Sequence, residues 1–116
     1  MEHTVSLKEN HLFRRAYNRG KSAADSRLAL YVRRNGRRNS RLGLTVSTKV
    51  GCAVVRNRVR RRLREIYRLN EERLVSGTDV VIVARVRAAE SGYRPLEKSF
   101  LKLADKLSLL KKEVSP

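Results

Sequence analysis

The residues best suited to chemistry are arginines, which crowd one short segment near the middle of the chain. Six arginines fall between Arg56 and Arg64, and Asn57 stands among them. A guanidinium group presents forked N–H donors that fit a phosphate, and an amide adds a neutral donor and acceptor. The segment therefore predicts a surface that binds an anionic partner.

Side chains for acid–base or metal-assisted catalysis are sparse by comparison. The histidines are His3 and His11, both near the N-terminus, and Asp25, Glu65 and Asp79 form no close cluster in the sequence. Hydrolysis by a protein needs a positioned acid and base or a metal bound by such groups. An autonomous nuclease is therefore a disfavoured interpretation.

The only cysteine, Cys52, can form no disulfide within the chain, and no cluster of Cys and His offers the ligands of a zinc site. Free cysteine is among the most often buried residue types, so we expect a small buried thiol.

Helical periodicity places the arginines on a helix with one apolar side. Arginines four residues apart on such a helix repel each other, as do Arg56 with Arg60 and Arg60 with Arg64, which favours a nucleic-acid surface over a merely solvated one. The apolar stripe comprises Cys52, Val55, Val59, Leu63, Ile66 and Tyr67, whereas Arg56, Asn57, Arg60, Arg61 and Arg64 point away from it.

Composition supports a polyanionic partner. The 116 residues include 28 Lys and Arg against 11 Asp and Glu, which gives a formal charge of +17, and no acidic residue stands between Asp25 and Glu65. The length and the 41% of hydrophobic residues fit one domain, residues 1–116 with an ordered core of about 7–112. No apolar run reaches the roughly 20 residues of a membrane span, and no signal segment is evident, so we expect a soluble cytoplasmic protein.

Patterning along the chain predicts the elements that position the arginines. A helix over residues 7–19 ends at Gly20, and alternating strands at 28–33 and 42–47 flank a basic turn, which predicts a hairpin. Residues 80–84 are typical of a strand buried on both faces, and leucines from Leu96 to Leu110 predict a last helix. The order α-β-β-α-β-α predicts a single α/β (α+β) domain, a small mixed sheet packed with helices.

The segment from Ala53 to Arg64, with its Arg-Asn-Arg core and trailing basic residues, resembles the signature helix of the bacterial ribonuclease P protein family. The resemblance spans nearly the whole chain. It includes the early helix with Phe13 and Tyr17, the strand with Tyr31, the Leu42-Gly43-Leu44-Thr45-Val46-Ser47 strand, Lys49 and Gly51 before the motif, and Ala84-Arg85 after the buried strand.

This resemblance implies a left-handed crossover, in which the motif helix joins two parallel strands against the usual rule. It also implies a function as the protein subunit of an endoribonuclease that removes the 5′ leader of precursor tRNA. The catalytic groups and the magnesium would belong mainly to ribonuclease P RNA, with no metal bound tightly by the protein. The implied partners are that RNA and precursor tRNA, without an obligate protein partner or a membrane.

Two sets of residues carry the implied binding roles. The set for the catalytic RNA is Arg56, Asn57, Arg58, Arg60, Arg61 and Arg64, and the set for leader or precursor tRNA is Phe13, Tyr17, Ala29, Tyr31 and Lys49. From the residues alone, Phe13 and Tyr17 could equally belong to a core, and Tyr31 could be an ordinary sheet residue.

Two other binding functions compete with this interpretation. A ribosomal or ribosome-assembly protein could use the same helix on rRNA, and only the ordered motif argues against it. An arginine helix could also enter a DNA major groove, but no helix-turn-helix partner or dimer surface is evident.

Overall fold

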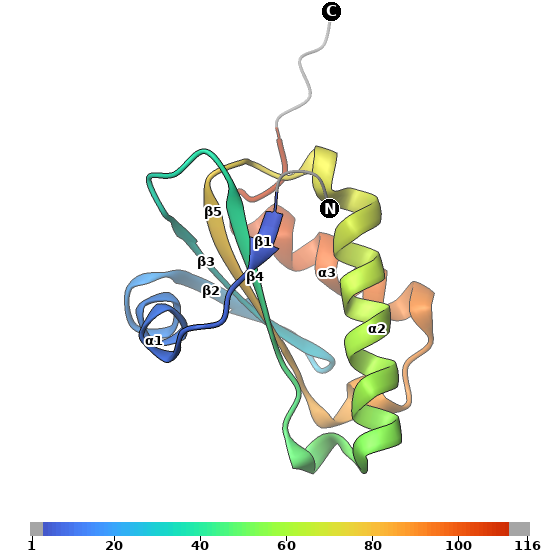
Figure 1. Ribbon diagram of the computed structural model, residues 1–116. Coiled ribbons are helices and arrows are strands. Elements are labelled where there is room, and N and C mark those ends of the chain that lie inside the picture. Colours follow the sequence, from blue (N-terminus) through green and yellow to red (C-terminus); the bar gives the residue numbers. More distant parts are fainter. Residues whose placement is uncertain (1–3, 112–116) are drawn as a thin grey trace, which may run out of the picture.

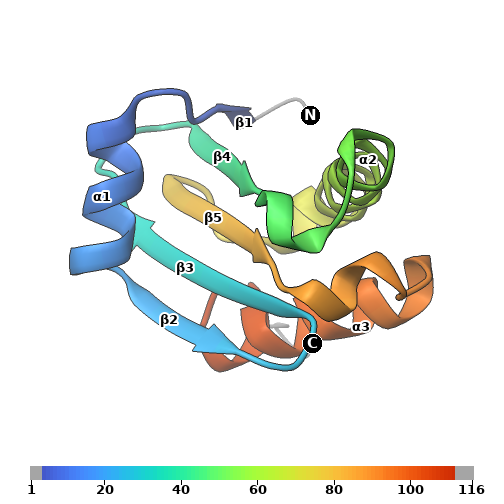
Figure 2. The ribbon, with the colours of Figure 1, turned by 90° about the horizontal axis from the view of Figure 1, so that it is seen from below.

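The computed structural model describes residues 4–111, in which a five-stranded sheet carries helices on both faces (Figures 1 and 2). Three 3₁₀ turns, η1 (Thr48–Val50), η2 (Glu71–Arg73) and η3 (Val86–Ala89), connect the main elements. Those elements are β1 (Thr4–Ser6), α1 (Asn10–Arg19), β2 (Lys21–Ala24), β3 (Leu28–Arg34), β4 (Ser40–Thr45), α2 (Ala53–Asn70), β5 (Thr78–Ala84) and α3 (Tyr93–Lys106).

The sheet has the order β1-β4-β5-β3-β2, so the predicted hairpin between residues 28–33 and 42–47 is wrong. β5 lies between β3 and β4, antiparallel to the first and parallel to the second. The reason is that β5 is apolar on both faces, and a central position buries both. The hairpin that does form joins β3 to β2, and neither β2 nor β1 was among the predicted strands.

The parallel strands β4 and β5 are joined through α2 by a left-handed crossover. In Figure 1 the chain runs down β4, rises through α2 on the right, and descends again in β5 behind β4. The path turns counterclockwise as it recedes from the viewer, which is the left-handed sense. The mixed sheet, the order of the six predicted elements and the crossover are all as expected.

Two apolar cores lie on the two faces of the sheet. Leu28, Leu30 and Val32 of β3 pack with α2 and α3 on one face, and the alternate residues turn to the other. On that second face α1 covers a smaller core, which contains Leu12, Ala16 and Val81 with Leu7. α1 and α2 therefore lie on opposite faces of the sheet (Figure 2).

The helix ends differ slightly from the predictions. α1 begins at Asn10, and Leu7 is buried ahead of it. Gly20 ends α1 as expected, because its N–H donates to the Ala16 carbonyl, and a side chain there would meet backbone oxygens of Ala16 and Val32 within 2.7 Å. α3 ends at Lys106, so Leu110 lies beyond it, bridged to Leu74.

The basic loop between β3 and β4 is anchored by a buried acid. Arg41 donates two hydrogen bonds to the carboxylate of Asp79, at 2.7 and 2.8 Å, and Asn35 donates a third at 3.0 Å. The Asp79 side chain is only 1% exposed, so removing either partner would leave a buried charge unpaired. Arg41 therefore stabilises the fold through Asp79 and is not a free surface cation. Arg37 and Arg38 are the exposed cations of the loop.

Asp25 closes the turn between β2 and β3. Its Oδ1 accepts the backbone N–H groups of Arg27 and Leu28 at 2.9 Å, and Lys102 of α3 lies 3.2 Å from Oδ2. Burial alone would raise the pKa of this carboxyl, but hydrogen bonds from the Leu28 N–H, the Ser99 hydroxyl and the Arg27 N–H lower the pKa from 3.8 to about 2. The ionised form thus ties the hairpin to α3.

We predict that Asp25→Asn lowers the free energy of unfolding by about 1 to 2 kcal/mol near neutral pH, since it removes charge-assisted hydrogen bonds. Because the folded pKa lies below the unfolded value, the stabilisation is complete above pH 3.8 and fades as the pH falls toward about 2. Urea unfolding at pH 6 and at pH 2.5 should show the gap between wild type and variant narrowing in acid. A constant gap would show that the charge of Asp25 contributes nothing.

Candidate nucleic-acid interface

The arginine segment forms α2, whose apolar stripe is buried as predicted from Val59 to Tyr67, whereas Val55 is half-buried. Val59, Leu63 and Ile66 are 0% exposed, and Tyr67 packs edge-on against Phe100 of α3 with ring centroids 6.3 Å apart. The Tyr67 hydroxyl meets the Thr4 hydroxyl at 3.0 Å, which fastens β1 to the helix, and burial raises the pKa of Tyr67. These contacts fix which side of α2 faces solvent.

The expectation that Cys52 is a buried thiol is wrong, because Cys52 is exposed at the N-cap of α2. Its backbone is extended, so the side chain leaves the helical stripe that periodicity alone would continue through it. The backbone N–H groups of Val55 and Val54 lower the pKa of the thiol, as expected of a group that faces the first turn of a helix.

One flank and the outer side of α2 carry most of the predicted RNA-binding residues. Arg60 lies over the end of β4, where its guanidinium reaches the Val46 carbonyl at 3.5 Å and the Asn57 side chain at 3.3 Å. Asn57, Arg61 and Arg64 are exposed, and Arg56 is half-buried one turn before Arg60. We call these five residues, Arg56, Asn57, Arg60, Arg61 and Arg64, the arginine face.

Arg58 belongs to the predicted set but lies on the opposite flank of the helix. At about 100° per residue it shares that flank with Arg62, whose guanidinium donates to the Ser91 carbonyl at 2.9 Å. The acidic residue of α2, Glu65, also lies there and pairs with Arg68, which lowers the pKa of Glu65. The flank toward α3 is thus partly neutralised, and the arginine face contains no acid.

The predicted aromatic residues come together on the opposite face of the sheet. Tyr17 lies edge-on to Tyr31 with ring centroids 4.9 Å apart, and the Phe13 and Tyr17 centroids are 6.4 Å apart. The Tyr17 hydroxyl meets the Thr45 hydroxyl at 3.0 Å, and the Tyr17 side chain is 37% exposed. Ala29 lies on the same face of β3 as Tyr31, two residues away.

An open groove runs along this cluster, and we call it the aromatic groove. It is lined by Asn10, Phe13, Arg14, Tyr17 and Thr45. Asn10, Arg14 and Thr45 were not among the predicted site residues. Strand alternation predicts that Thr45 lies on the same face of the sheet as Gly43. Nothing in the sequence, however, indicates that β4 lies beside α1.

Gly43 makes room for the floor of the aromatic groove. A Cβ atom at Gly43 would stand 2.6 Å from Phe13 Cε1 and 3.1 Å from Leu7 Cδ2, far inside van der Waals contact. The Phe13 ring therefore rests directly on the backbone of β4. It can approach the strand this closely only because residue 43 has no side chain.

Lys49 stands apart from the other predicted leader residues. It is exposed on η1, past the end of β4, and does not line the aromatic groove. Its position lies between the groove on one face and the first turn of α2 on the other. The structure thus gathers four of the five predicted residues and leaves Lys49 at the end of the sheet.

Residues 4–111 offer neither a metal site nor a membrane span. No group of three or more His, Cys, Asp or Glu side chains gathers there in a way that could hold a metal ion. None of the helices in this part of the chain is long and apolar enough to cross a membrane. The arginine face and the aromatic groove remain the two candidate binding surfaces.

Comparisons with known proteins agree on one family. The family model described as Ribonuclease P matches residues 1–108. The chain is 42% identical to the ribonuclease P protein component of Natranaerobius thermophilus, covering 98% of this chain and 99% of that one, and 41% identical to that of Alkaliphilus metalliredigens, covering 95% and 99%.

Solved structures give the same result for the fold. The RNase P protein of Staphylococcus aureus superposes with a TM-score of 0.84 at 27% identity, over 91% of this chain and 97% of that one. The RNase P protein from Thermotoga maritima gives 0.78 at 28% identity, over 92% and 98%.

The contact between Gly43 and Phe13 generates a prediction. Gly43→Ala should lower the free energy of unfolding by about 1 to 3 kcal/mol, because the ring must leave its place. The same substitution in a Phe13→Ala background should cost much less, and chemical denaturation of the four proteins measures this coupling. Gly92→Ala is a suitable control, since the nearest atom to its Cβ would be 3.9 Å away. If the losses in unfolding free energy of Gly43→Ala and Phe13→Ala were simply additive, the contact between the two residues would be contradicted.

Proposed function

The chain belongs to the ribonuclease P protein family, and from this premise we propose how its two surfaces divide the work of the holoenzyme. Ribonuclease P is an endoribonuclease that trims the 5′ end of tRNA, and the family supplies the protein subunit that joins ribonuclease P RNA. We propose that the arginine face binds this RNA and that the aromatic groove binds the 5′ leader of precursor tRNA.

The observation that carries the proposal is the separation of the two surfaces by the sheet. α1, with the aromatic groove, covers one face, and α2 packs on the other (Figure 2). Two RNA segments can therefore be held at once without competing for the same side chains. A protein with a single RNA surface would not need both.

The arginine face suits a folded RNA because none of its residues is acidic, and the neighbouring Glu65 is paired with Arg68. Guanidinium groups hold phosphate oxygens through paired N–H donors, and the buried stripe of α2 keeps them in a fixed array. If each of the four arginines of this face neutralises about one phosphate, log affinity should fall with log salt concentration with a slope of roughly −3 to −4.

The aromatic groove suits a single strand of variable sequence. Phe13, Tyr17 and Tyr31 offer ring faces and edges, and stacking of a base on an aromatic side chain contributes about 1 to 3 kcal/mol whatever the base. Arg14 on the rim can hold a phosphate of the same strand. Lys49 and Ala29 are proposed to extend this contact, Lys49 toward the cleavage site and Ala29 as space for a base.

We further propose that catalysis and magnesium belong to the RNA partner. A magnesium ion would be repelled by the positive charge of both surfaces, and the proposed role of the chain is to hold RNA segments in place. Since bacterial precursor tRNA is made in the cytoplasm, we propose that compartment as the place of action.

Reconstitution tests the proposal. At low magnesium, precursor tRNA should be cleaved by purified protein combined with a bacterial ribonuclease P RNA, and far less by either component alone. Gel analysis of the 5′ leader product measures this. Absence of stimulation would refute the proposed function, and cleavage by protein freed of all RNA would place the catalytic groups in this chain.

Two double variants test the division between surfaces. Arg60→Ala with Arg64→Ala should weaken binding to ribonuclease P RNA about tenfold or more and flatten the salt slope by roughly one to two. Phe13→Ala with Tyr31→Ala should leave that affinity within about twofold and weaken binding of precursor tRNA to the holoenzyme by about tenfold or more. Mature tRNA, which has no leader, is the control ligand. If both double variants weakened only the binding of the protein to ribonuclease P RNA, the division into two surfaces would be refuted.

A further inference from the structure

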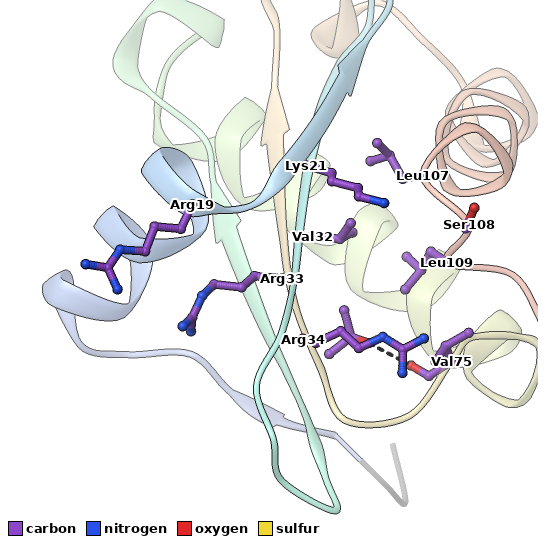
Figure 3. Close-up of a pocket in the computed structure, with 10 residues that line it drawn as sticks. Arg19, Lys21, Val32, Arg33, Arg34, Val75, Leu107, Ser108 and Leu109 are labelled. Atoms are coloured by element: carbon purple, nitrogen blue, oxygen red, sulfur yellow. Dashed lines mark hydrogen bonds between the residues drawn. The ribbon is translucent and has the colours of Figure 1, made fainter.

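A hollow of about 230 Å³, separate from the aromatic groove, opens at the free edge of the sheet beside β2 (Figure 3). None of its lining residues belongs to α2 or to the aromatic groove. Four of the ten lining residues are basic, none is acidic, and the remainder are mostly aliphatic. We call this hollow the edge pocket.

Sheet register brings two of the cations into the pocket. Lys21 of β2 pairs with Val32 of β3, so the two side chains share the face of the sheet that α3 covers. Arg34 lies two residues beyond Val32 and therefore on the same face, at a diagonal separation of about 7 to 8 Å from Lys21. Figure 3 shows both side chains on the α3 side of the strands, Lys21 toward Leu107 and Arg34 toward Val75, with Arg19 and Arg33 on the other side of the strands.

The far wall of the edge pocket is held in place by backbone hydrogen bonds. The Val75 N–H donates to the Leu109 carbonyl at 2.8 Å, and the Leu109 N–H donates to the Ala104 carbonyl of α3 at 2.9 Å. Ser108 adopts a left-handed conformation with φ of 57°, which a non-glycine residue seldom takes unless its surroundings impose it. The pocket is therefore built before any ligand arrives.

The edge pocket lacks an internal counter-charge. Among residues 4–111, neither Lys21 nor Arg34 forms an ion pair. They share the lining of the hollow with the half-buried apolar side chains of Val75 and Leu107. Exposed cations are commonly just solvated, but two like charges beside a partly apolar hollow fit an anion with an apolar body.

We propose that the edge pocket is a third RNA contact, in which Lys21 and Arg34 hold one phosphodiester of an RNA strand. The attached nucleoside lies against Val75 and Leu107, which are half-buried. A nucleotide combines a compact anion with a largely apolar sugar and base, which is the chemistry that this lining recognises. The inference rests on the proposed function, since that function supplies the two RNAs from which the strand can come.

The test is the double variant Lys21→Ala with Arg34→Ala, in which both altered side chains are exposed, so the fold should be retained. Loss of one phosphate contact should reduce the salt slope by about 0.7 to 0.9 and affinity by about five- to eightfold at 0.1 M salt. The exchange variant Lys21→Arg with Arg34→Lys keeps both charges and should keep most of the affinity. The matched control is Arg94→Ala with Lys98→Ala, exposed residues of α3 that do not line the pocket.

Two binding arms distinguish the source of the strand. One titrates ribonuclease P RNA with the protein, and the other titrates precursor tRNA with the assembled holoenzyme. A loss in either arm that exceeds the loss of the control supports the pocket and assigns its ligand. No loss in either arm, or an equal loss in the control, overturns the pocket and leaves the proposed function intact. A wild-type chain that bound neither RNA would overturn both.

Discussion

The packing of the apolar stripe of α2 against the sheet and α3 is the interaction on which the remaining arrangement depends. The helix carries arginines at successive turns, and each such pair costs a few tenths of a kcal/mol. Burial of an aliphatic side chain such as Val59, Leu63 or Ile66 contributes about 1.5 to 3 kcal/mol, so packing outweighs the repulsion by a wide margin. A segment that would be a poor helix alone becomes a rigid support for guanidinium groups.

The few acidic residues are used in ways that keep the binding surfaces positive. Asp79 pairs with Arg41 below the loop between β3 and β4, and Asp25 pairs with Lys102 across the hairpin turn. Glu65 pairs with Arg68 on the flank of α2 away from Arg60. Asp79 and Asp25 are thus matched to cations that hold the fold together, and the exposed pair of Glu65 with Arg68 neutralises part of one flank of α2. Of the 28 basic residues, nine lie on the arginine face, the aromatic groove and the edge pocket, and no acidic residue belongs to any of the three.

Sequence patterns predict the burial of individual helices and strands, which depends on neighbouring residues. They do not predict which distant segments pack together. The stripe of α2 and the double burial of β5 follow from periodicity, and both are found. The hairpin of β3 with β4 was wrong because strand pairing depends on which strand needs two buried faces, and β5 comes later in the chain. Cys52 was misplaced because periodicity does not reveal where a helix begins. Phe13, Tyr17 and Tyr31 were grouped only by resemblance, since no spacing in the sequence reveals that α1 crosses β3.

The geometry of the aromatic groove would make the proposed binding of a leader strand both firm and tolerant of sequence. The edge-on contact of Tyr17 with Tyr31 and the hydroxyl contact with Thr45 hold the rings in place, so little side-chain entropy remains to be lost when a strand binds. Gly43 lets Phe13 sit against the sheet, which keeps the groove shallow and open. Ring faces do not distinguish one base from another, whereas a floor of buried amides would. A groove set by packing, with charge at its rim, therefore suits a strand whose sequence varies from one precursor to the next.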